Sequence, residues 1–110
     1  MQSPAQSSRE SSGSARCLHL VVGAGREALE DCLPQVASAD TVLFLDSGVL
    51  HLLGPTVGSL AGSAAAVFFA QADLRAHGLL ELARRVQADT LDDAGFCELL
   101  GTHDHCLTWT

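Results

Sequence analysis

The chain has 110 residues, which is enough for one domain with a single hydrophobic core. Hydrophobic residues make up 47% of it and charged residues 17%, the composition of a compact globule whose apolar stretches are too short to cross a bilayer. All six basic residues are arginine, and the formal net charge is -7 with neutral histidines. Because nucleic-acid binding relies on clustered Lys and Arg, no direct contact with RNA or DNA is expected.

Four cysteines could belong to a disulfide scaffold, but the amino terminus does not show the basic-then-apolar layout of a secretory signal. The cysteines also lie within apolar patterns that can form a core by themselves. We therefore expect free thiols and a cytoplasmic location.

Residues 1–16 consist mainly of Ser, Gln, Ala and Gly and should form a disordered tail before a single domain over 17–110. The run Cys17–Val22 predicts a buried strand, followed by a turn at Gly23-Ala24-Gly25. These glycines resemble the start of a dinucleotide fingerprint, but Ala28 stands where its third glycine belongs. A plain strand-to-helix turn is preferred, and a small nucleotide-binding protein remains an alternative.

Apolar residues recur at helical spacing from Arg26 onward, with acidic residues between them. The helix should break just after Cys32, because Pro34 cannot donate the next helical hydrogen bond and disfavours helical angles at Leu33. The pattern then predicts a buried strand at Thr41–Leu45. Further on it predicts a short helix at Gly48–Leu53, a loop or loose helix at 54–63, a strand at Ala64–Ala70, and a helical turn at Asp73–Ala76 capped by Gly78.

The segment Leu79–Arg85 has a helical pattern, and Asp92 is a suitable N-cap for a helix over Ala94–Leu100. The alternating residues Cys106–Trp109 predict a short final strand. Strands alternating with helical stretches imply a small three-layer α/β sandwich with a mainly parallel sheet of four to five strands.

Cys32 is the first candidate for chemistry, because a thiol at the end of a helix can act as a nucleophile. The reactive form is the thiolate, which needs exposure and a lowered pKa. The neighbouring Glu30 and Asp31 would oppose ionisation. The alternative is that Cys32 is a small hydrophobic residue on the inner face of the helix.

The remaining thiols and imidazoles are expected to be structural. Cys17, Cys97 and Cys106 should belong to the core. His19 should be a buried, hydrogen-bonded histidine, with its side chain opposite to those of its leucine neighbours. His51 and His77 should lie at the surface. The donors of His103-Asp104-His105-Cys106 lack the paired spacing of zinc sites, so a solvated loop is expected there.

Several of these segments together resemble the DsrH/TusB family of bacterial sulfur-relay subunits. The likeness begins at Leu18-His19, continues through Leu29–Leu33 and Val42–Gly48, and returns at Asp73–Gly78. It covers about Cys17 to Trp109 in one register. The C-terminal positions that match are Asp92, Gly95, Phe96, Leu99 and Trp109.

The resemblance implies a heterohexamer with DsrE/TusD-like and DsrF/TusC-like subunits and a TusE/DsrC-like sulfur acceptor. Such complexes pass persulfide sulfur between cysteines, for 2-thiouridine formation at the tRNA wobble position or for dissimilatory sulfur oxidation. Cys32 stands where some members carry a sulfur-accepting cysteine. The implied activity is that of a sulfurtransferase-like persulfide carrier, without a metal or organic cofactor, rather than of an enzyme that turns over alone.

The sequence departs from the family pattern at Pro34, where relatives have helix formers, and at His77, where they have Arg. The likeness also places a loop after Gly78 and a short strand near Arg85–Ala88, against the helical pattern there. The alternative function is a non-catalytic structural or interaction subunit with a buried Cys32. A homodimer in the absence of partners is left open, and Trp109 could pack against the core edge or a partner.

Overall fold

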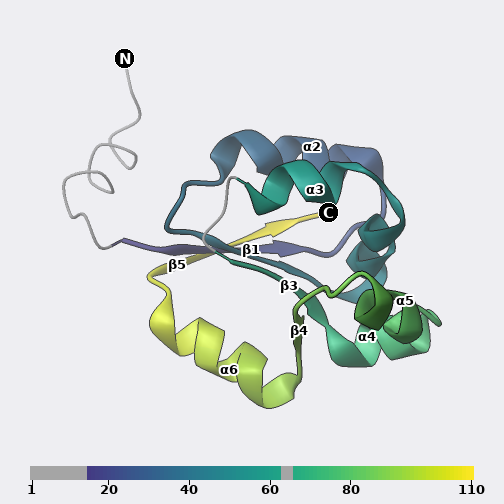
Figure 1. The fold of residues 1–110 in the computed structure, drawn as a ribbon. Coiled ribbons are helices and arrows are strands. Elements are labelled where there is room, and N and C mark those ends of the chain that lie inside the picture. Colours follow the sequence, from purple (N-terminus) through teal and green to yellow (C-terminus); the bar gives the residue numbers. More distant parts are fainter. Residues whose placement is uncertain (1–14, 63–65) are drawn as a thin grey trace.

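The computed structural model describes residues 15–62 and 66–110, which form an α/β sandwich around one parallel sheet (Figure 1). The sheet order is β4-β3-β2-β1-β5, and every neighbouring pair is parallel. This confirms the predicted fold class. The strands are β1 (Cys17–Val21), β2 (Thr41–Phe44), β3 (Ala66–Ala70), β4 (Thr90–Leu91) and β5 (His105–Trp109).

The helices cover the two faces of the sheet unequally. The chain steps from β1 to β4 in one direction and then returns across the whole sheet to β5. Because such crossovers are right-handed, the returning helix must lie on the opposite face from the earlier ones. Figure 1 shows α2 and α3 above the sheet and α6 below it. The helical elements are α2 (Arg26–Cys32), η1 (Leu33–Gln35), η2 (Asp46–Leu53), α3 (Thr56–Ala61), α4 (Gln71–Ala76), α5 (Leu80–Arg85) and α6 (Asp93–Thr102), the η elements being 3-10 helices.

The main core lies on the face of the sheet that α2 and α3 cover, and it extends to α4 and α5 (Figure 1). Its centre is the stacked pair Phe44 and Phe69, whose ring centroids are 4.8 Å apart. All four residues of β2 are buried, as expected for a central strand covered on both faces. The buried members of this core are Val21, Ala28, Leu29, Cys32, Val42, Phe44, Val49, Leu60, Phe69, Leu74, Leu79 and Ala83.

The α2 helix ends at Cys32, as the position of Pro34 predicts. The chain continues as the three-residue 3-10 helix η1, with Pro34 in its first turn. Proline is tolerated there because the first N–H groups of a helix have no internal partner. The break therefore leaves Cys32 as the last α-helical residue.

A glycine-based cap separates α4 from α5. Gly78 has φ 70°, and its N–H donates to the Arg75 carbonyl (3.2 Å). The Leu79 N–H donates to the Leu74 carbonyl (2.7 Å), which completes a Schellman motif. Leu80–Arg85 is helical, as its pattern predicts. The expectation of a strand near Arg85–Ala88 is wrong, because the Val86 and Ala88 N–H groups still bond to carbonyls of α5, and the strand forms at Thr90–Leu91.

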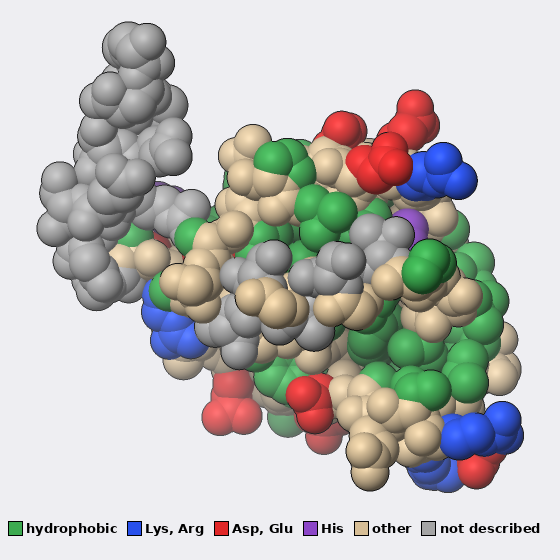
Figure 2. All heavy atoms as spheres, turned by 45° about the horizontal axis from the view of Figure 1, so that its top comes forward, with side chains coloured by type: hydrophobic (Ala, Val, Ile, Leu, Met, Phe, Trp, Pro, Cys, Tyr) green, Lys and Arg blue, Asp and Glu red, His purple; other side chains and the backbone are tan. Residues whose placement is uncertain are grey.

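The surface carries exposed apolar side chains at several separate places. Figure 2 shows hydrophobic side chains spread over the right-hand part of one face, with charged groups toward its edges. No helix within the described residues is long and apolar enough to span a membrane. The large hydrophobic residues that are most exposed are Leu53, Val86, Leu100 and Leu107.

Candidate functional site

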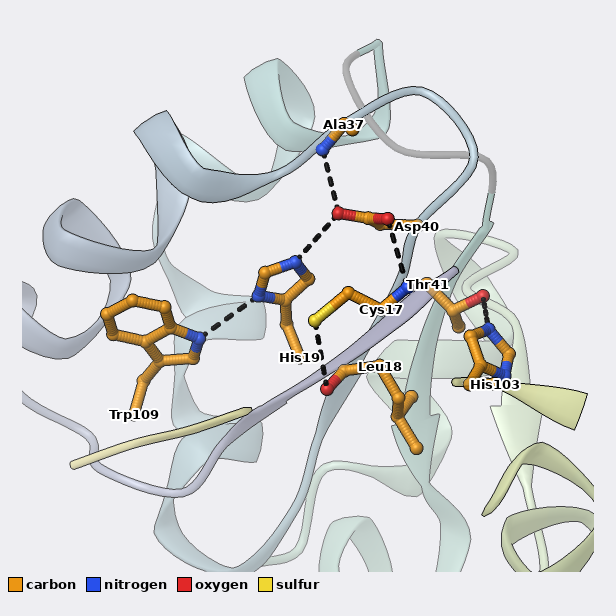
Figure 3. Close-up of polar contacts among 8 residues, drawn as sticks. All are labelled: Cys17, Leu18, His19, Ala37, Asp40, Thr41, His103 and Trp109. Atoms are coloured by element: carbon orange, nitrogen blue, oxygen red, sulfur yellow. Dashed lines mark hydrogen bonds and ion pairs between the residues drawn. The ribbon is translucent and has the colours of Figure 1, made fainter. Parts of the chain in front are cut away.

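A buried carboxylate lies immediately before β2 and organises the polar interior. Asp40 is 0% exposed. Its Oδ1 accepts from the Cys17 backbone N–H (3.1 Å), and its Oδ2 accepts from the Ala37 N–H (2.9 Å). The Nε2 of His19 lies 3.0 Å from the same Oδ2 (Figure 3). Burying a carboxylate is costly unless it is hydrogen-bonded, and these contacts supply hydrogen bonds to both of its oxygens.

The contact at the second nitrogen of His19 determines the tautomer of the neutral ring. The indole Nε1–H of Trp109 donates to His19 Nδ1 (3.2 Å), so Nδ1 must carry a lone pair. The proton of the neutral ring therefore lies on Nε2 and points at the Asp40 carboxylate. The Trp109 and His19 rings are also stacked, with centroids 6.1 Å apart. His19 is thus the buried, hydrogen-bonded histidine that the sequence predicts.

This network joins three segments that are far apart in sequence. It connects β1, the turn before β2 and the last residues of β5 (Figure 3). Within the described part of the chain, every buried side-chain nitrogen and oxygen has a hydrogen-bond partner. Such a fully satisfied network makes a core rigid and specifies a single arrangement of it.

Cys32 lies in the core beside this network. Its side chain is 0% exposed. Burial, which is the largest cause, and the nearby Cys17 and Asp40 together raise the pKa of the Cys32 thiol from 9.0 to about 12. The thiol is therefore protonated at neutral pH, and it cannot attack sulfur in this conformation.

Cys17, His19 and Asp40 form a buried group whose possible metal-ligand atoms lie within 4.8 Å of one another. His19 and Asp40 already share a hydrogen bond of 3.0 Å, and a bound ion would have to replace it. The arrangement fits a shared proton better than an ion. The sequence analysis did not identify Asp40, although an acidic residue directly before a mainly apolar strand was a usable signal.

Two of the cysteines expected in the core are exposed. Cys17 is buried, but Cys97 and Cys106 lie at the surface. The expectation is wrong for Cys97 because α6 contains no buried residue. It is wrong for Cys106 because β5 is an edge strand. Partial burial raises the pKa of Cys106.

The predicted solvated loop is wrong at His103, which is half-buried, and at His105 and Cys106, which belong to strand β5. The Nδ1 of His103 lies 2.8 Å from the Leu99 carbonyl oxygen, and its Nε2 lies 2.8 Å from Thr41 Oγ1. Since a carbonyl only accepts, Nδ1 donates to it, and in the neutral ring Nε2 accepts from the Thr41 hydroxyl. His103 therefore ties α6 to β2.

Of the two histidines expected at the surface, only His77 is exposed. His51 is half-buried, and its Nε2 lies 2.9 Å from the Gly23 carbonyl, to which it must donate. It fastens η2 to the turn after β1. The prediction failed because nothing in the sequence shows that this turn and η2 are adjacent.

Among the hollows at the surface of the described residues, two have no cysteine among their lining residues. One, of about 320 Å³, is lined by residues of α2 and η2 that include Arg26, Glu30 and His51. The other, of about 350 Å³, is mainly apolar and includes Val57, Val67 and Val86. Neither hollow gives a sulfur donor access to Cys32.

A model of the DsrH-like protein family matches residues 24–106. The chain belongs to the DsrH-like family. No curated protein matches it. The matched part of this DsrH-like chain runs from the turn before α2 into β5 and includes Cys32. Membership indicates a sulfur-relay subunit that belongs to a multi-subunit complex.

Proposed function

We propose that this DsrH-like chain is a structural and interaction subunit of a cytoplasmic sulfur-relay complex. Its partners would be DsrE/TusD-like and DsrF/TusC-like subunits, together in a heterohexamer. The observation that carries the proposal is the state of Cys32, which is completely buried with its thiol pKa raised to about 12. The protein's contribution is then its surface, and the persulfide is carried by partner cysteines.

The chemistry of a relay explains why burial matters. A carrier thiolate attacks the outer sulfur of a donor persulfide, a new S–S bond forms, and the donor leaves as a thiolate. The attacking sulfur must be ionised and must approach along the donor S–S bond. Cys32 meets neither condition. Its raised pKa keeps the thiol protonated, and the surrounding core covers it.

The complex would pass sulfur as persulfide to a TusE/DsrC-like acceptor, for tRNA 2-thiolation or for sulfur oxidation. The net charge of -7 supports an indirect role if RNA is the final substrate, because this subunit would repel phosphates. A partner would then hold the tRNA.

A second candidate is that Cys32 itself carries sulfur, as a persulfide carrier rather than a turnover enzyme. One observation favours it. Cys32 is the last residue of α2, and the segment after it is a single 3-10 turn with exposed residues at Pro34 and Gln35. Local opening of such a segment, driven by a partner, would expose the thiol.

The two candidates differ in where sulfur is found. The wild type and a Cys32→Ser variant would each be assembled with the partner subunits and incubated with a cysteine desulfurase and cysteine. We expect intact mass to show reductant-sensitive sulfur on a partner, equal in both complexes, and none on this chain. Reductant-sensitive sulfur on the wild-type chain that is absent from Cys32→Ser would establish the carrier role instead.

Two controls complete this experiment. Cys97→Ser and Cys106→Ser variants identify sulfur that attaches to the exposed thiols. Failure of the chain to bind the partner subunits would overturn both candidates, since each requires the complex.

A further inference from the structure

The two edges of the sheet are unequal. β4 is an edge strand of two residues, too short to present a useful ladder to another chain. β5 is an edge strand of five residues (Figure 1). Natural edge strands are usually protected by Lys, Pro, bulges or inward-pointing charges. His105–Trp109 contains no Lys, Pro, Asp or Glu, so this edge lacks those protective residues.

The backbone of β5 alternates between its neighbour and the open side. The His105 N–H donates to the Arg16 carbonyl, and the Trp109 carbonyl accepts from Val22 and Gly23. Residues 105 and 109 therefore point toward β1, and by the period of two so does Leu107. It follows that the N–H and C=O groups of Cys106 and Thr108 point outward from the sheet.

We propose that β5 pairs with β5 of a second copy of this chain, antiparallel and about a two-fold axis at Leu107. In this register Cys106 lies opposite Thr108 of the second copy and Thr108 opposite its Cys106. Both are hydrogen-bonded pairs, so all the outward groups of the two residues are satisfied in four bonds. If the two-fold axis lay at Cys106 or at Thr108 instead, only the residue on the axis would have its outward N–H and C=O groups satisfied in a hydrogen-bonded pair, formed with its own symmetry mate.

Side chains and charge also favour a second copy as the occupant. Leu107 is 45% exposed, and the two-fold places it directly against Leu107 of the second copy. The net charge of -7 would repel two copies at most surfaces, but β5 itself carries no acidic side chain. The contact is isologous and closes on itself, which is typical of homodimers. It depends on the edge strand alone and not on the proposed function.

The register predicts one specific cross-link. Leu107 would form a non-hydrogen-bonded pair with its symmetry mate, at a Cα separation of about 4.5 Å that a disulfide can bridge. Thr108 and its mate would be diagonal neighbours, roughly 7 Å apart, which is too far. In a background of Cys97→Ser and Cys106→Ser, mild oxidation should therefore link Leu107→Cys into a covalent dimer at least about tenfold faster than Thr108→Cys.

Sedimentation of the unmodified chain gives the second measurement. We expect its mass to rise with concentration toward that of a dimer. Leu107→Lys should raise the dissociation constant of the dimer at least about tenfold, because it places two like charges opposite each other. Leu53→Lys, at an apolar residue that is 63% exposed on another element, should leave it unchanged. A chain that stays monomeric, equal cross-linking of the two cysteine variants, or equal effects of the two lysine variants would each overturn the proposal.

Discussion

The buried Asp40 accepts hydrogen bonds from two backbone N–H groups and from the His19 ring. The groups belong to β1 and to the turn before β2, so this one carboxylate aligns the turn with the strand. Hydrogen bonds to a charged acceptor are stronger than those between neutral groups. Removing one partner of a buried hydrogen-bonded pair leaves the other partner unsatisfied. Asp40 therefore stabilises the junction between β1 and the turn before β2.

We expect Asp40→Asn to lower the free energy of unfolding by roughly 2–4 kcal/mol. The amide nitrogen of Asn cannot accept a hydrogen bond, so at least one of the three donors would face another donor. Urea denaturation followed through the fluorescence of Trp109, the single tryptophan, measures the change. Asp89→Asn, at an exposed loop residue, is the matched control. Equal stability of the two variants would contradict this role for Asp40.

Cys32 should make the protein sensitive to alkali. Its thiol pKa is raised from 9.0 to about 12, so its contribution to stability is fully present below pH 9.0 and is lost as the pH rises toward about 12. The difference corresponds to at most roughly 4 kcal/mol. Above pH 9.0 the free energy of unfolding should fall more steeply for the wild type than for Cys32→Ala. Parallel pH profiles would contradict the burial of an un-ionised thiol.

At the scale of the elements, Gly48 allows η2 to pack against the end of β1. A Cβ at this position would overlap the Val21 carbonyl oxygen, which is backbone and cannot move aside. That same oxygen accepts from the Leu45 N–H, so it holds the end of β2 as well. The close approach of η2 to the strand is thus possible only without a side chain at position 48.

We expect Gly48→Ala to lower the free energy of unfolding by about 3 kcal/mol or more, because the strand end or η2 must shift. Gly101→Ala is the matched control. It lies in α6 with open space around the added Cβ, and there Ala should stabilise by about 0.5–1 kcal/mol through its higher helix propensity. Thermal unfolding measures both. A Gly48→Ala variant as stable as Gly101→Ala would show that η2 does not pack as described.

The layers of the whole molecule differ in how firmly they are packed. The upper face carries the main core, whereas α6 crosses the lower face and has no buried residue. It is held by its Asp92 N-cap, by His103 and by partly buried side chains such as Phe96 and Leu99. Elements with little buried apolar surface open most readily.

Native-state hydrogen exchange should reveal this difference. We expect the amides of α6 to exchange through local opening, at least about tenfold faster than those of β2, which should exchange only through global unfolding. Both segments are hydrogen-bonded in the native state, so intrinsic exposure of the amides does not explain the difference. Equal protection of α6 and β2 would indicate that the lower layer is as firmly bound as the core.

The order and type of most elements follow from the sequence alone. The apolar runs of β1 and β2, the break after Cys32 at Pro34, the glycine cap at Gly78 and the Asp92 N-cap are local signals, because each depends on residues within one or two turns of chain. Alternation of strands and helices then determines the α/β class. The order of the matching segments was also enough to indicate the DsrH/TusB family.

Only the tertiary structure decided what the polar and sulfur-bearing side chains do. Asp40 accepts a hydrogen bond from His19, which is 21 residues away in the chain. Trp109 donates a hydrogen bond to His19 across 90 residues. Their meeting depends on which strands become neighbours, and β5 lies beside β1 only after the chain has crossed the whole sheet. The same holds for Cys32, since helical spacing allowed either a reactive or a buried thiol. Its burial depends on how closely α2, β1 and the turn before β2 pack, which is a property of long-range contacts.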